Sequence, residues 1–102
     1  MDIIEEIGVE AVLGQLAEEA AELAQAALKM QRIIHGTNPT PVTLEEAREN
    51  LIEEAVDVDI CLSLIGDADG RIRYSKELLD QKLIRWEQRI ETAKAEMPCF
   101  NP

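Results

Sequence analysis

Two short acidic segments with helical spacing limit what this chain can fold into. The first covers residues 18–22 (EEAAE) and the second covers residues 53–57 (EEAVD). Carboxylates three or four positions apart lie on one side of a helix, so each segment presents its acids on one side if it is helical. Carboxylates that converge between packed helices repel one another unless a cation lies among them. The sequence therefore predicts a helical protein with a cation site, and Mg2+ is the expected ion.

Composition favours an all-α protein of one domain. Ala, Glu, Leu and Ile are frequent among the 102 residues, whereas Trp, Tyr and Phe occur once each, and no β-type alternation is present. A chain of this length has a modest core, so we expect it to bury further surface by self-association. Two cysteines do not make a disulfide framework, and we expect neither a signal peptide nor a membrane span. A cytoplasmic location is the simplest setting for such a chain.

Charge is distributed unevenly along the chain. The formal net charge is −11, and residues 1–70 contain sixteen acids and three bases, whereas residues 71–102 contain five acids and seven bases. Binding to a nucleic-acid backbone depends on Lys and Arg neutralising phosphates, so we expect no nucleic-acid partner. A basic segment beside an acidic groove that holds a metal would instead suit a small polyphosphate.

Start and stop signals predict three main helices, over about residues 8–35, 44–65 and 71–96, with a short separate turn before the first. Gly36 follows the last periodic residue of the first helix, and breakers fill the loop over residues 36–42. Thr43 and Glu46 form a capping-box pattern that opens the second helix. The third helix is expected to stop before Pro98.

Helical periodicity predicts which side of each helix is packed. On the first helix the expected apolar arc is Leu13, Leu16, Ala20, Leu23, Ala24, Ala27 and Ile34, with Glu19 at its border. The second helix is expected to have one apolar band made of Leu44, Ala47, Leu51, Ala55, Val58, Leu62 and Ile65, and another made of Val56, Ile60 and Leu64. The expected core side of the third helix is Ile72, Leu79, Leu83, Trp86, Ile90, Ala93 and Met97.

The acidic segments supply the oxygen ligands that Mg2+ prefers, because this ion is typically held by a few carboxylates together with waters and substrate phosphates. The predicted ligands are Glu19, Glu22, Glu54 and Asp57. Glu18 and Glu53 are close enough in sequence to join them or to act as a base. Asn50 can orient a ligand or touch substrate, and Lys29, two turns after Glu22, can reach a phosphate.

The pattern Glu-Glu-x-x-Glu followed by Glu-Glu-x-x-Asp resembles the MazG-like all-α nucleoside triphosphate pyrophosphohydrolases, whose relatives include dimeric dUTPases and phosphoribosyl-ATP pyrophosphohydrolase. Residues 50–60 (NLIEEAVDVDI) and 82–90 (KLIRWEQRI) resemble the small stand-alone members. The resemblance covers roughly residues 10–96. It implies a MazG-like helical bundle that is completed by oligomerisation into a homodimer or homotetramer.

The resemblance also implies a reaction and a set of roles. The reaction is Mg2+-dependent cleavage of a nucleoside triphosphate to a monophosphate and pyrophosphate. Glu19, Glu22, Glu54 and Asp57 would be metal ligands, and Glu18 would be a further ligand or the base that activates water. The implied phosphate contacts are Lys29, Lys82, Arg85 and Arg89.

A second class of function stays open at this stage. The chain could be a non-catalytic acidic helical oligomer, or an interaction module that binds nucleotide without turnover. Acidic clusters on helices are most often solvated surfaces, and an ordinary exposed basic face explains residues 82–89 equally well. Cys61 lies on the acidic stripe of the second helix and is expected to fill space as a small apolar side chain.

Overall fold

The computed structural model describes residues 1–36 and 39–96, and this part of the chain is helical with no strand. The helices are α1 (Ile3–Ile7), α2 (Val9–His35), α3 (Leu44–Ala68) and α4 (Lys76–Glu96). The all-α prediction is therefore confirmed. The chain divides into two compact units, residues 1–72 and residues 73–102. Met97, which we expected on the core side of the last helix, lies outside the described residues.

Local signals fix the ends of α2 and the start of α3. Gly36 has a φ of +70° and its N–H donates to the Arg32 carbonyl, so the C-terminal cap of α2 uses a left-handed conformation that glycine adopts without strain. The Glu46 N–H donates to Thr43 Oγ1 at 3.1 Å, and the Thr43 N–H donates to the Glu46 carboxylate at 3.4 Å. This is the capping box that the sequence predicts.

Two predicted helix boundaries are wrong. The second helix continues to Ala68 instead of ending near residue 65, and the last helix begins at Lys76 instead of residue 71. Asp69 accepts hydrogen bonds from the Arg71 N–H and from its guanidinium, which stabilises a turn where we expected a helix. Ser75 Oγ accepts from the Leu78 N–H at 3.1 Å, a bond typical of a helix N-cap, so α4 begins after Ser75.

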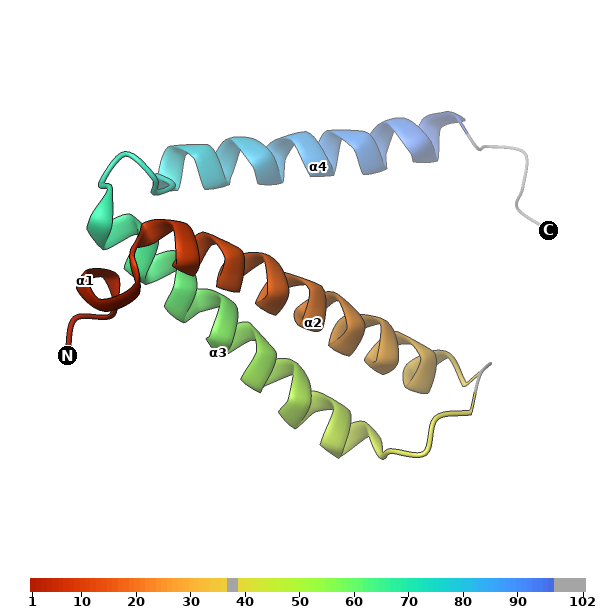
Figure 1. Cartoon of the computed structure of the whole chain (residues 1–102). Helices are drawn as coiled ribbons and strands as arrows, with labels where there is room; N and C mark the ends of the chain where they lie inside the picture. The colour runs from red at the N-terminus through yellow and green to blue at the C-terminus, as the bar shows by residue number, and fades with distance from the viewer. Residues whose placement is uncertain (37–38, 97–102) are drawn as a thin grey trace. The chain divides into compact units, whose positions relative to one another are not determined.

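Helices α2 and α3 lie side by side in opposite directions and form the first unit with α1 (Figure 1). On each of the two helices, one line of buried or half-buried side chains recurs at alternating intervals of three and four positions. We call these two lines of residues the α2–α3 seam. On α2 the seam is Val12, Leu16, Glu19, Leu23, Ala26, Met30 and Ile33. On α3 it is Ala47, Leu51, Glu54, Val58, Cys61 and Ile65.

The seam corrects the apolar arcs that periodicity predicts. Leu13 and Ile34 are exposed on α2, and Ala55 and Leu62 are exposed on α3, although we expected all of them on the packed side. Val12 and Ala26, which we did not place there, are almost fully buried. A core cluster of Val12, Cys61 and Ile65 lies at one end of the seam and is extended by Ile4, Leu16 and Leu64.

Helix α4 belongs to the second unit and every one of its side chains is exposed in the single chain. Among the described residues of the second unit, nothing covers the expected core side of this helix, which includes Leu83 and Trp86. No helix in the described residues combines the length and the apolar character needed to cross a lipid bilayer.

Candidate metal centre

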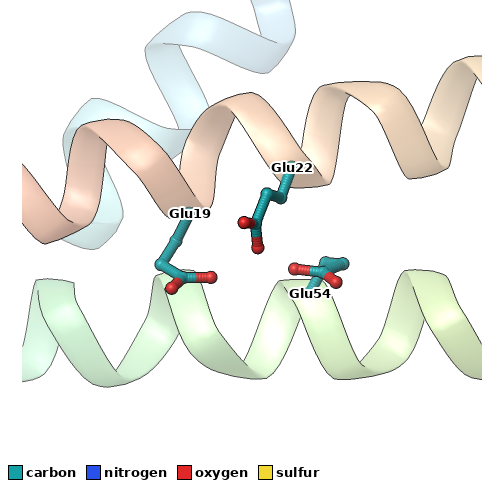
Figure 2. A group of neighbouring side chains, drawn as sticks. All are labelled: Glu19, Glu22 and Glu54. Carbon is teal, nitrogen blue, oxygen red and sulfur yellow. The ribbon is translucent and has the colours of Figure 1, made fainter.

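Three carboxylates from two helices meet in the α2–α3 seam. Glu19 and Glu22 project from α2 toward α3, and Glu54 projects from α3 toward α2 (Figure 2). Each supplies one oxygen, and these oxygens all lie within 4.8 Å of one another. We call Glu19, Glu22 and Glu54 the carboxylate cluster. Three of the four predicted metal ligands thus converge in one place.

The seam register explains why the cluster is partly withdrawn from water. Glu19 and Glu54 occupy seam positions that are otherwise filled by apolar side chains, whereas Glu22 lies at the exposed edge. The Oε2 atoms of Glu19 and Glu54 are sealed from solvent and have no hydrogen-bond partner among the described residues. A sealed carboxylate oxygen without a partner is costly, so an unpaired polar atom in this position needs an explanation.

Electrostatics within the cluster raise the pKa of Glu19 above its ordinary value. Gln15 donates a 2.6 Å hydrogen bond to Glu19 Oε1, which lowers the pKa. Desolvation and the negative charges of Glu22 and Asp57 act in the opposite direction, and together they outweigh that bond. The site therefore disfavours negative charge on Glu19 unless a positive charge compensates it.

The donor set suits a small hard cation. All three side chains offer carboxylate oxygens, and the described residues within the cluster include no His or Cys ligand. Mg2+ takes oxygen ligands and usually keeps several waters, so a few carboxylates at the open edge of a groove can hold it. Glu19, Glu22 and Glu54 are the residues that would bind the ion.

Asp57, the fourth predicted ligand, is half-buried on α3 and lies beside the carboxylate cluster without joining it. Its charge is near enough to raise the pKa of both Glu19 and Cys61. Cys61 itself is 5% exposed and its pKa is raised chiefly by burial. The interpretation of Cys61 as a space-filling side chain agrees with this burial.

The two remaining acids of the predicted site are exposed. Glu18 lies on α2 one turn before Glu22, and Glu53 precedes Glu54 on α3; neither contributes to the carboxylate cluster. Lys82, Arg85 and Arg89 are exposed on α4, in the second unit, and their contact with substrate stays a prediction.

A pocket of about 540 Å³ adjoins the cluster. Glu22 and Glu54 line it together with two residues that are predicted to contact substrate, Asn50 and Lys29. The other lining residues are Gln25, Ala26, Leu28 and Arg32. We did not select Arg32 from the sequence, although its position three residues after Lys29 places the two side chains next to each other on α2.

Comparisons of the chain with protein-family models, with curated proteins and with solved structures give no match. The resemblance to MazG-like proteins therefore depends on the residues of this chain alone. What the structure adds to it is the geometry of the carboxylate cluster and of the pocket beside it.

Proposed function

We propose that the protein is a Mg2+-dependent nucleotide pyrophosphohydrolase, which cleaves a nucleoside triphosphate to a nucleoside monophosphate and pyrophosphate. The observation that carries this proposal is the carboxylate cluster, because two of its oxygens are sealed in an apolar seam with no hydrogen-bond partner in the described part of the chain. Acids kept only for solubility have no physical reason to occupy such positions. This burial favours a ligand site over the alternative of a non-catalytic acidic module.

The proposed chemistry is hydrolysis of a phosphoric anhydride. Water attacks the α-phosphorus and the bond from that phosphorus to the bridging oxygen breaks, so the electron pair leaves with pyrophosphate. The proton lost by the attacking water passes to the carboxylate of Glu18, which is exposed and lies one turn from Glu22. When bound, Mg2+ neutralises phosphate charge and orients the oxygens.

The surrounding residues position the substrate in this proposal. Asn50 lines the pocket on the α3 side and can donate its amide hydrogens to a phosphate or sugar oxygen. Lys29 lines the same pocket from α2. Catalysis of phosphoryl transfer consists mostly of positioning and charge stabilisation, so these residues supply nearly all the groups that hydrolysis needs. Lys82, Arg85 and Arg89 are further proposed phosphate contacts, and Glu53 is a proposed additional metal ligand.

We also propose that the active protein is a homodimer or homotetramer. Ile52, Val56 and Ile60 are each at least half exposed on α3 and follow one another at intervals of four, so they form a stripe that we call the outer α3 band. Contiguous apolar side chains of this size on a surface helix are typical of an interaction site. A second copy is the partner that a small helical chain most simply uses to cover them.

The test is a panel of nucleoside triphosphates and diphosphates incubated with Mg2+, followed by identification of the products. Release of pyrophosphate and a nucleoside monophosphate supports the proposal, and it should require Mg2+ and be abolished in Glu22→Gln. Glu45→Gln is the matched control, because Glu45 is exposed at the start of α3 and far along the helix from the cluster. Release of orthophosphate, or no hydrolysis of any nucleotide, would contradict the proposed reaction.

A further inference from the structure

The cationic side chains of the first unit gather at one end of the pocket. Residues 1–70 contain only three basic residues, and two of them, Lys29 and Arg32, line the pocket that also contains Glu22 and Glu54. The third, Arg48, is exposed elsewhere on α3. In a segment this acidic, two of three bases at one pocket is a marked concentration of positive charge.

Neither cation is neutralised by the acids around it. Lys29 and Arg32 are both half-buried, and among residues 1–36 and 39–96 no ion pair or hydrogen bond involves their side chains. A half-buried charge that stays unpaired keeps its full capacity to bind an anion. The two side chains are therefore available to a negatively charged ligand in the pocket.

Helix geometry orients this pair relative to the carboxylate cluster. Lys29 and Arg32 follow Glu22 by seven and ten residues, which is about 10 and 15 Å along the axis of α2. The Cα–Cβ bonds of a helix tilt toward its N-terminus, so both side chains leave the backbone in the direction of Glu22, and both line the pocket that Glu22 lines. The pocket thus has a carboxylate end suited to a metal and a cationic end suited to an anion.

The lining also indicates which part of a nucleotide occupies the cationic end. None of the eight lining residues is aromatic, and Leu28 and Ala26 are the apolar ones. Recognition of a base commonly uses stacking on an aromatic ring, and this pocket offers none. The phosphate chain, with its concentrated negative charge, fits the cationic end better than the base does.

We infer that Lys29 and Arg32 bind the two phosphates that leave as pyrophosphate, and that this contact makes the site select nucleoside triphosphates over diphosphates. A diphosphate cleaved at the same bond would place one phosphate at the cationic end instead of two. The inference rests on the proposed function. It adds Arg32 to the site, and it places the leaving phosphates of the substrate at the cationic end of the pocket.

The experiment compares wild type with Arg32→Ala, Arg32→Lys and the matched control Arg48→Ala by calorimetry. Mg2+ alone is titrated first, and the variants should bind it as wild type does because none of them removes a carboxylate. Pyrophosphate is then titrated into the Mg2+-saturated proteins. Arg32→Ala should weaken pyrophosphate binding by about tenfold or more, since a hydrogen bond to a charged group is lost. Arg32→Lys should restore part of the affinity, and Arg48→Ala should leave it unchanged.

A panel of nucleoside monophosphates shows which half of the substrate the cationic end holds. Monophosphate binding to Arg32→Ala should match wild type, and the ratio of kcat/KM for triphosphate over diphosphate should fall in this variant. Equal loss of monophosphate and pyrophosphate affinity, or unchanged pyrophosphate affinity, would overturn the inference.

The outcome also separates this inference from the proposed function. If wild type binds no Mg2+, the metal-dependent proposal fails, and the pyrophosphate titration is repeated on the metal-free protein. Binding that still depends on Arg32 would support the cationic end as an anion site, and absence of binding would overturn both. Thermal unfolding of each variant confirms that a loss of binding does not come from a loss of folding.

Discussion

At the scale of single residues, Glu19 and Glu54 are carboxylates at positions that a helix pair normally fills with apolar side chains. Each has one oxygen that is sealed and without a partner in the described residues, and desolvation contributes to the raised pKa of Glu19. Such residues lower the stability of the metal-free fold. A divalent ion among them would reverse the repulsion, so ligand binding and stability should be coupled at these two residues.

Glu54→Gln tests this coupling because it keeps the shape of the side chain and removes one charged ligand. In wild type, Mg2+ at a hundred times its Kd should stabilise the fold by about 2.7 kcal/mol, and the thermal midpoint should rise accordingly. In Glu54→Gln most of that rise should disappear. Differential scanning calorimetry with and without Mg2+ measures it, with the exposed Glu49→Gln on the same helix as control. A full Mg2+ shift in Glu54→Gln would exclude Glu54 as a ligand.

The hydrogen bonds of Asp69 lead to a second prediction for a single residue, which concerns the stability of the fold at acid pH. The side-chain and backbone hydrogen bonds from Arg71 lower the pKa of Asp69 below its ordinary value. The unfolded chain therefore takes up the proton at a higher pH than the folded chain does, so this pair stabilises the fold above the ordinary Asp pKa of about 3.9. That stability is lost as the pH falls through the lower folded value.

Asp69→Asn removes this dependence. Its urea midpoint should lie below that of wild type at neutral pH, and the difference should shrink as the pH is lowered below about 4. Urea titrations at a series of pH values measure both midpoints. A difference that stays constant or grows on acidification would show that the Arg71 contact does not act through the charge of Asp69.

At the scale of secondary-structure elements, the sequence predicts correctly the helix ends at Gly36 and Thr43, misses the end of α3 and the start of α4, and predicts packed sides less well. Thr43 and Gly36 act on backbone groups within a few residues, so their effect can be read from neighbouring residues. Which side of a helix is packed depends instead on where its partner helix lies. Ala and Leu occur on nearly every side of α2, so periodicity wrongly places Leu13 in the core, where the structure buries Val12 instead.

The same reasoning explains which parts of the candidate site were found. Glu19, Glu22 and Glu54 share a repeated spacing that can be recognised without a structure. Arg32 lies about 80° around α2 from Glu22, so helical spacing links it to the predicted site only through its neighbour Lys29. Its place in the pocket follows only from the way α3 packs against α2.

Ile65 provides the test of the seam itself. This side chain is 1% exposed and belongs to the core cluster with Val12 and Cys61, so Ile65→Ala leaves a cavity that its neighbours fill only in part. The free energy of unfolding should fall by about 2 to 5 kcal/mol. Leu62→Ala, three residues earlier and 42% exposed, should cost distinctly less. Urea unfolding of both variants measures the costs, and equal losses would contradict the observed seam.

At the scale of the whole molecule, few side chains are fully buried and many large apolar ones are exposed. The buried apolar residues of the described chain are Val12, Ala26, Ala47, Cys61 and Ile65. Exposed ones include the outer α3 band in the first unit and Leu83, Trp86 and Ile90 on α4 in the second. A helix such as α4 whose side chains are all exposed gains little stability from packing inside its own unit, because helices in water depend on burial of one side. We expect association of copies to supply that burial.

Ile60→Glu is the variant that tests association, because it places a charge in the outer α3 band. Wild type should sediment as a dimer or tetramer in analytical ultracentrifugation, and Ile60→Glu should shift the protein to smaller species, since an unpaired charge in an apolar interface is strongly disfavoured. Gln31→Glu makes the same change of charge at an exposed position on α2 and should leave the assembly intact.

Trp86 is the single Trp and is 63% exposed, so its emission should move to longer wavelength on dilution of wild type if association covers it. A wild type that is monomeric at every concentration, with unchanged Trp86 emission, would mean that these apolar side chains stay in water.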